Sequence, residues 1–130
     1  LFRSDELPDG FRPQMAYISM TLPGVARGPH EHREQSDGFC FIGPSTFRLY
    51  LWDNRPSSPT FGTHWTSDVG ESAMTFVVVP PGIAHGYKNI GLTEGIVFNS
   101  PNRLYAGDGR KEPVDEIRHE GVNDSPFRFP

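Results

Sequence analysis

Three histidines in two separate motifs have the spacing to bring their imidazoles to one point. His30 and His32 are two residues apart in the first motif, and His85 lies in a second motif, residues 80–89. Residues i and i+2 of a β-strand point to the same side. His30 and His32 can therefore face one cavity, and His85 can join them from a neighbouring strand. Convergent imidazoles predict either a metal site or an acid–base site, and both imply chemistry on a small molecule.

A carboxylate follows the first histidine pair. Asp37 comes five residues after His32, and Zn, Fe, Mn and Ni all accept imidazole together with carboxylate. If the site holds a divalent metal, we expect the ligands to be His30, His32, Asp37 and His85. The alternative is a metal-free acid–base pocket, with Asp37 capping the turn before Phe39.

Composition limits the other classes of function. A chain of 130 residues suits one domain spanning residues 1–130, and its net charge of -4 gives no electrostatic reason to expect nucleic acid. No apolar stretch approaches the ~20 residues of a membrane span. The single cysteine, Cys40, excludes an intrachain disulfide, and the first residues lack the apolar region of a signal peptide. We therefore expect a cytoplasmic protein, with Cys40 buried and inert.

The chain reads as a series of short strands. Its 14 glycines and 13 prolines punctuate it about every ten residues, which favours a β-sandwich or barrel. The expected strands are residues 14–21, 39–42, 46–52, 73–79 and 95–98, with a loop at 53–59. The charged segment 110–120 is expected to be irregular or to carry a short helix around 114–119.

Two aromatic residues are candidates for ligand binding. Tyr50 and Trp52 alternate with Phe47, Leu49 and Leu51, so the two groups occupy opposite faces of one strand. Tyr50 and Trp52 could line the cavity and stack on a base or sugar. The alternative is that they pack within the barrel.

Both histidine motifs resemble the signature motifs of cupins, which are all-β jelly-roll barrels. The second motif supplies Pro80, Gly82, His85 and Asn89 at the family spacing, and the first supplies His30, His32 and Asp37. More specifically, residues 25–30, 53–62 and 82–86 resemble the dTDP-4-dehydrorhamnose 3,5-epimerase family. The similarity runs from about Gly24 to Tyr105, and cupins of this kind often form homodimers through an edge strand, here residues 14–21.

The resemblance implies a reaction on a nucleotide-linked 4-keto sugar. The ketone acidifies the neighbouring C–H, a base removes that proton, and the carbon is reprotonated from the other face. By position His30 matches the family's base, and His85 matches a pocket histidine that could polarise the keto oxygen. Arg27 matches the arginine that holds the diphosphate. The epimerases require no metal cofactor.

Several positions depart from the epimerase pattern. Phe98 stands where the family places the tyrosine that donates a proton, so the remaining donors would be water, His32 or a tyrosine such as Tyr50. His32 adds an imidazole that the epimerases commonly lack, and Arg27-Gly28-x-His30-x-His32 resembles the cupin 3,4-ketoisomerases of dTDP-4-keto-6-deoxyglucose. A single epimerisation, a keto shift, a metal-dependent cupin enzyme acting on a small acid, and a non-catalytic sugar-binding cupin all remain as hypotheses.

Overall fold

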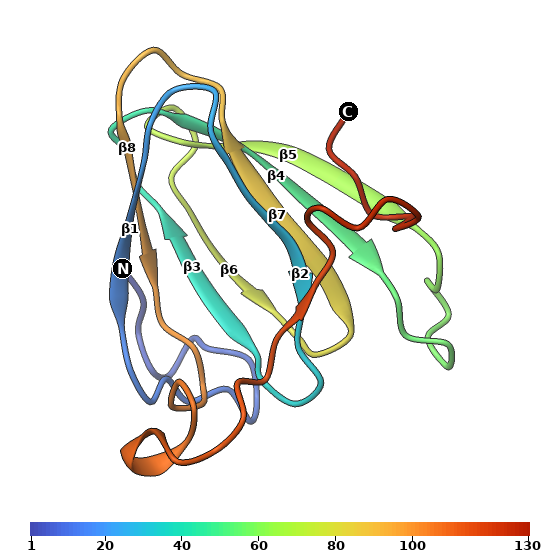
Figure 1. The fold of residues 1–130 in the computed structure, drawn as a ribbon. Helices are drawn as coiled ribbons and strands as arrows, with labels where there is room; N and C mark the ends of the chain where they lie inside the picture. The colour runs from blue at the N-terminus through green and yellow to red at the C-terminus, as the bar shows by residue number, and fades with distance from the viewer.

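Two antiparallel sheets face each other in a computed structural model that describes residues 1–130 (Figure 1). The first sheet has the order β1-β8-β3-β6, with β1 (Tyr17–Thr21), β8 (Gly95–Asn99), β3 (Asp37–Phe41) and β6 (Thr75–Val79). The second has the order β5-β4-β7-β2-β9, with β5 (His64–Gly70), β4 (Thr46–Asp53), β7 (Ile83–Asn89), β2 (Ala26–Glu31) and β9 (Ile117–Arg118). The all-β jelly-roll expected of a cupin is confirmed.

The hydrophobic core fills the space between the two sheets because the inward residues of each strand are apolar. Tyr87 on β7 meets Phe41 and Phe47 edge-on, with ring centroids 5.5 and 5.6 Å away. Fully burying each such side chain contributes roughly 1.5–3 kcal/mol. The buried members of this core are Phe39, Phe41, Phe47, Leu49, Val69, Val79, Ile83, Tyr87 and Val97.

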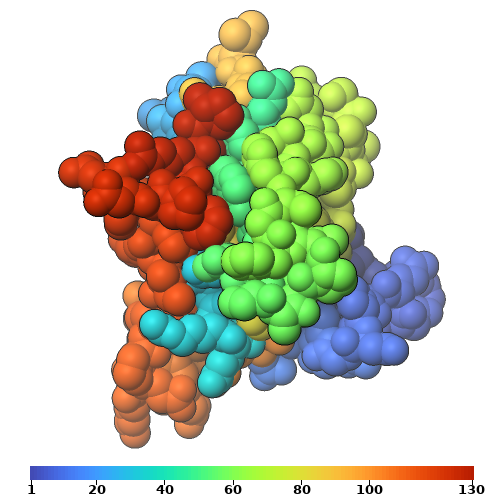
Figure 2. All heavy atoms as spheres, turned by 90° about the vertical axis from the view of Figure 1, so that its right-hand side faces the viewer, coloured from blue at the N-terminus to red at the C-terminus, as the bar shows by residue number.

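Tyr50 and Trp52 lie on the outer face of β4, so the expectation that they line the cavity is wrong. With Ala84 they form a second buried cluster, against which Phe127 and Phe129 of the C-terminal tail pack. Figure 2 shows the tail lying against β4 and β5 on this side of the molecule. The alternation along the strand is confirmed, and the inward set is Phe47, Leu49 and Leu51.

The tail holds no helix at residues 114–119, which corrects the expectation of one there. Ile117 and Arg118 instead form β9, which pairs with the free edge of β2 through Glu31 and His30. A helix this short is only marginally stable on its own. Pairing with β2 instead gives the backbone of this segment hydrogen-bond partners on an open sheet edge. The helical content is one 3₁₀ turn, Asp108–Arg110, and no helix has the length and apolar character that crossing a membrane requires.

Candidate functional site

The pairing of β2 with β7 brings two of the histidines together. His30 lies directly opposite His85, and their ring centroids are 4.5 Å apart. Residues directly opposite in an antiparallel pair share one face, and on β7 that face also carries Tyr87 of the core. His32 follows the end of β2, and its ring centroid lies 5.4 Å from that of His30. The convergence expected of the three imidazoles is therefore present.

A β-bulge sets the direction of these side chains. Arg27 pairs with Tyr87 and His30 with His85, so β2 contains one more residue than β7 between the two pairs. The extra residue lets Arg27 and His30 point to the same interior. Gly28 has φ 85°, and a Cβ there would lie 2.6 Å from the carbonyl oxygen of His85. Only glycine fits this position, which gives a physical reason for the Arg-Gly-Pro-His sequence.

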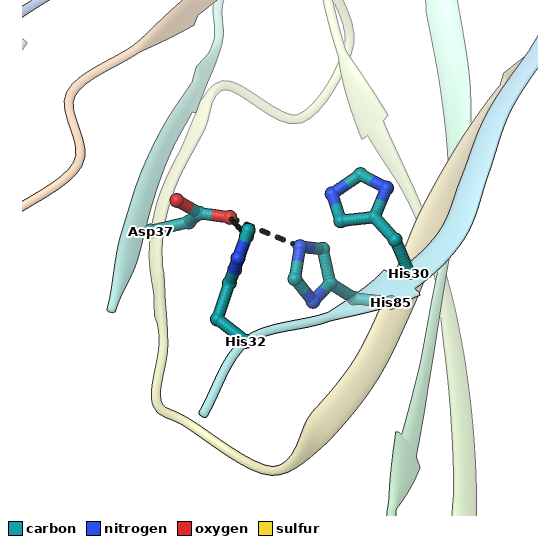
Figure 3. A group of neighbouring side chains, drawn as sticks. All are labelled: His30, His32, Asp37 and His85. Carbon is teal, nitrogen blue, oxygen red and sulfur yellow. Dashed lines mark hydrogen bonds and ion pairs between the residues drawn. The ribbon is translucent and has the colours of Figure 1, made fainter. Parts of the chain in front are cut away.

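Asp37 reaches the histidines from the opposite sheet (Figure 3). It is the first residue of β3, and its Oδ2 lies 2.9 Å from His32 Nε2 and 3.1 Å from His85 Nε2. Gln35 Nε2 donates to the other carboxylate oxygen at 2.7 Å. The side chains of Asp37, His32 and His85 are all buried. We call His32, Asp37 and His85 the carboxylate triad.

The backbone fixes the far side of both rings in the carboxylate triad. His85 Nδ1 lies 2.8 Å from the carbonyl oxygen of Ile83, and His32 Nδ1 faces the carbonyl oxygen of Asp115. An Nδ1 beside a carbonyl must carry the hydrogen, which leaves each Nε2 directed at an acceptor, the Asp37 carboxylate. A proton on Nε2 can be donated to Asp37, and a cation bound between the three groups is the alternative partner.

The pKa shifts separate His30 from this group. Burial raises the pKa of Asp37, but the hydrogen bonds from His32 and His85 outweigh it and hold that pKa well below its usual range. Burial lowers the pKa of His32, and the Asp37 carboxylate outweighs it and raises the pKa. Burial, reinforced by the charges of His85 and His32, lowers the pKa of His30 to about 3. His30 is thus a neutral imidazole with a lone pair to offer.

The same residues fit a divalent metal. One ligand atom from each of His30, His32, Asp37 and His85 lies within 4.8 Å of all the others. Three imidazoles and one carboxylate are a donor set that Zn, Fe, Mn and Ni accept. The carbonyl oxygens that accept from Nδ1 of His32 and His85 are the outer partners that usually orient metal-bound histidines.

A cavity of about 660 Å³ opens beside the histidines. His30, His32 and Asp37 line it, and so do residues of the loop after β8 and of the segment that leads to β9. Figure 1 shows that these two segments run close together at one end of the sandwich. Its other polar and aromatic lining includes Tyr17, Arg33, Gln35, Arg103, Tyr105, Arg110, Glu112 and Glu116. The volume is that of a pocket for a small molecule.

Arg27 and Phe98 do not line this cavity. The Arg27 guanidinium donates to Thr21 Oγ1 at 3.1 Å and to the carbonyl oxygen of Met20 at 2.7 Å, which ties β2 to β1. Phe98 lies between the inward residues Val97 and Asn99 and therefore points out of the sandwich. Phe98 consequently does not occupy the place of a pocket tyrosine, contrary to the expectation from sequence.

Sequence reasoning missed three residues of this site. Tyr17 and Tyr105 line the cavity, and alternation along residues 17–21 was the one signal that could have placed Tyr17 inward. The Asp115 carboxylate accepts from the backbone N–H groups of residues 33–35, each at 2.9 Å. Asp115 thereby fixes the loop between His32 and Asp37. The two segments are some eighty residues apart in the sequence, so no local pattern predicts this contact.

Comparison with known proteins places this geometry in a family. Over 107 residues the chain is 40% identical to the probable low-salt glycan biosynthesis epimerase Agl13 of Haloferax volcanii, covering 81% of this chain and 67% of that protein. The chain belongs to the sugar-epimerase family of Agl13. It spans 67% of the length of Agl13 and 49% of that of a second relative, the spore coat polysaccharide biosynthesis protein SpsL of Bacillus subtilis. No family model matches the chain.

Solved structures share the fold of this Agl13 relative. A dTDP sugar isomerase from Desulfovibrio desulfuricans superposes with a TM-score of 0.82 at 21% identity, over 98% of this chain and 77% of that one. A dTDP-4-dehydrorhamnose 3,5-epimerase from Sulfolobus tokodaii gives 0.72 at 24% identity, over 98% and 71%. The resemblance expected from the two histidine motifs is thus confirmed.

Proposed function

We propose that the protein is an epimerase or isomerase of a nucleotide-linked 4-keto-6-deoxy sugar, with His30 as the base. The observation that supports this proposal is the contrast between His30 and its neighbours. Both Nε2 atoms of the carboxylate triad are directed at Asp37, whereas the neutral His30 ring makes no such pair and lines the cavity. A neutral imidazole that faces a pocket is a suitable group to remove a proton next to a ketone.

His32 provides the complementary charge, because the Asp37 carboxylate outweighs the effect of burial and raises the pKa of His32. Removing the C–H proton places negative charge on the keto oxygen, and a fixed positive group nearby stabilises that enolate. His32 lines the cavity and is better placed than His85 to face the oxygen, because His85 is 2% exposed. The family's role for His85, polarising the keto oxygen, is therefore proposed for the triad as a unit.

The diphosphate of the substrate has candidate partners other than Arg27, the residue expected from sequence. Arg33, Arg103 and Arg110 line the cavity, whereas Arg27 does not. A guanidinium is well shaped for the oxygens of a diphosphate. We assign diphosphate binding to these three arginines. Arg27 instead holds β2, the strand that carries His30, against β1.

The test is NMR of dTDP-4-keto-6-deoxyglucose in D2O. The expected result is deuterium at C3 faster than without protein, together with a new epimer or ketose. Deuterium at both C3 and C5 would indicate the double epimerisation. Nucleotide binding without any exchange above the uncatalysed rate would contradict the enzyme and leave a sugar-binding protein.

A metal-dependent enzyme acting on a small acid is the second candidate, and the convergence of the four ligand atoms favours it. His30, His32, Asp37 and His85 would hold the ion. A bound divalent metal would act as a Lewis acid on a carbonyl or carboxylate oxygen. Elemental analysis of protein purified without chelators tests this candidate, which predicts one metal ion per chain.

Homodimerisation is proposed through β1. This edge strand exposes the outward side chains of Ile18 and Met20, which are 61% and 54% exposed, and an open apolar edge invites pairing with another strand. Sedimentation as a monomer at micromolar concentration in analytical ultracentrifugation would contradict the dimer.

A further inference from the structure

Inverting a carbon next to a ketone needs two proton-transfer groups on opposite sides of the sugar ring. The base removes a proton from one face, and an acid must return one to the other face. His30 reaches the cavity from β2 in the five-stranded sheet. A group that delivers a proton to the opposite face therefore has its natural place on the facing sheet, β1-β8-β3-β6.

Few inward residues of that sheet carry a proton to give. Near the cavity they are Tyr17 on β1, Asp37 on β3 and Asn99 on β8. The Asp37 carboxylate is the acceptor of the carboxylate triad and so has no proton to offer. The Asn99 amide donates to the carbonyl oxygen of Val97 at 3.0 Å and to Ser19 Oγ at 3.2 Å, and amides are not acids near neutral pH. Tyr17 is left.

We propose that Tyr17 is the catalytic acid that reprotonates the sugar from the face opposite His30, an inference that rests on the proposed epimerase function. Tyr17 lines the same cavity as His30. It lies opposite Asn99 in the β1–β8 pair, which directs its ring into the interior. The residue is 49% exposed, so its ring is open to a ligand.

The state of the phenol agrees with this role. Partial burial of the phenol, followed by the negative charge of Asp37, raises the pKa of Tyr17 to about 12, and no side-chain hydrogen bond is among the causes of that shift. The phenol therefore keeps its proton at every pH at which the protein would work. Its hydroxyl is free to hydrogen-bond a substrate.

The proton balance closes without a further reactant. His30 takes the proton from the carbon next to the ketone, and the C–H electron pair moves to form the enolate. The Tyr17 O–H then gives its proton to that carbon from the other side, and the enolate collapses to the ketone. The phenolate regains a proton from water and the imidazolium of His30 loses one to water, so the substrate is isomerised and both groups are restored.

Tyr50 provides a matched control. Its ring lies on the outer face of β4, in the second buried cluster, where the ring of Phe129 meets it edge-on with centroids 5.0 Å apart. Tyr50 does not line the cavity, so it cannot face His30 across the two sheets. His32 is not an alternative donor in this geometry, because its Nε2 faces Asp37 at 2.9 Å.

The experiment compares exchange with inversion for Tyr17→Phe and Tyr50→Phe in D2O. For Tyr17→Phe we expect formation of the epimer to fall by about 10²–10⁴-fold. Deuterium should still enter the recovered substrate with its configuration retained, because His30 can return a deuteron to the face from which it took the proton. Tyr50→Phe should epimerise within about threefold of the wild type, and Tyr17→His should recover part of the inversion because imidazolium is also an acid.

The possible outcomes distinguish failure of the role of Tyr17 from failure of the proposed epimerase function. Epimer formation at the wild-type rate in Tyr17→Phe overturns the role of Tyr17 while the proposed function stands. Loss of exchange and inversion together, with the melting temperature and nucleotide-sugar binding unchanged, also overturns it, because Tyr17 would then act before reprotonation. Absence of exchange in the wild-type protein overturns the epimerase function itself.

Discussion

His30 and His85 face each other across the β2–β7 pair with their ring centroids 4.5 Å apart. One ring belongs to the carboxylate triad and the other does not, although both are imidazoles on the same interior face. Burial, followed by the charges of His85 and His32, lowers the pKa of His30 to about 3. An unprotonated imidazole lone pair is thus held beside His32, whose pKa the Asp37 carboxylate raises against the effect of burial.

His30→Gln should strongly slow deuterium exchange while leaving substrate binding intact. General base catalysis contributes about 10²–10⁴-fold, so the exchange rate measured by NMR should fall by that factor. His64→Gln is the control, because His64 lies on the edge strand β5 and stacks against Trp52 on the outer face. Exchange by His30→Gln at the wild-type rate would show that another group is the base.

If the protein binds a divalent metal, His85→Ala should remove it. Elemental analysis of the wild type should then give one ion per chain, and His85→Ala should give close to none. His119→Ala should retain the ion, because His119 pairs with Glu31, which is not one of the four candidate ligands. Substoichiometric metal that is unchanged in His32→Ala would argue against the site.

The central features of the site were predictable from sequence because they depend on local geometry. Two histidines at i and i+2 share a face where the backbone is extended, and the rings of His30 and His32 converge with centroids 5.4 Å apart although β2 ends at Glu31. The partnership with His85 and Asp37 followed from the family resemblance and is confirmed by the contacts. The strand at residues 64–70 was not predicted, because its polar, exposed residues lack the alternation of a half-buried strand.

The side on which Arg27 and Phe98 lie could not be read from local pattern. A single bulge at Gly28 changes the alternation of β2, and the inward face of β8 is decided by its partners β1 and β3. Likewise, Tyr50 and Trp52 are buried on the outer face only because Phe127 and Phe129 return to cover them. Such contacts are determined by the tertiary fold rather than by the residues near them in sequence.

Tyr50 and Trp52 should therefore contribute to stability and not to substrate binding. Trp52→Ala should lower the free energy of unfolding by about 3 kcal/mol, since it leaves a cavity under the C-terminal tail. Urea unfolding measures this loss. The KM of folded Trp52→Ala and the KM of Tyr50→Phe should both stay at the wild-type value. A raised KM in Tyr50→Phe with an unchanged melting temperature would instead indicate direct contact with substrate.

Asp53 should make the stability of the loop after β4 depend on pH. The Arg55 guanidinium donates to both carboxylate oxygens of Asp53, at 2.9 and 2.7 Å, and Ser58 and Thr60 donate to one of them at 2.7 and 2.6 Å. The hydrogen bond from Arg55 is the largest cause that holds the pKa of Asp53 below its usual range, ahead of those from Thr60 and Ser58. A carboxyl with a lower pKa in the folded state stabilises the fold above its unfolded pKa of about 3.9, and this contribution is lost as the pH falls towards the folded value.

Urea unfolding of the wild type and Asp53→Asn at pH 7 and pH 3 tests this dependence. At pH 7 the wild type should be the more stable of the two, because only the ionised carboxylate accepts all four hydrogen bonds as a charged group. At pH 3 the difference should shrink, because Asp53 of the unfolded chain takes up a proton below its pKa of about 3.9 while folded Asp53 stays ionised. Asp68→Asn is the matched control: its partner Arg48 also holds the pKa of Asp68 low, but the side chains of that pair are 46% and 47% exposed, so solvent screens it and its effect should be small at both pH values. An equal difference for Asp53→Asn at both pH values would mean that the loop is held by the shape of residue 53 and not by its charge.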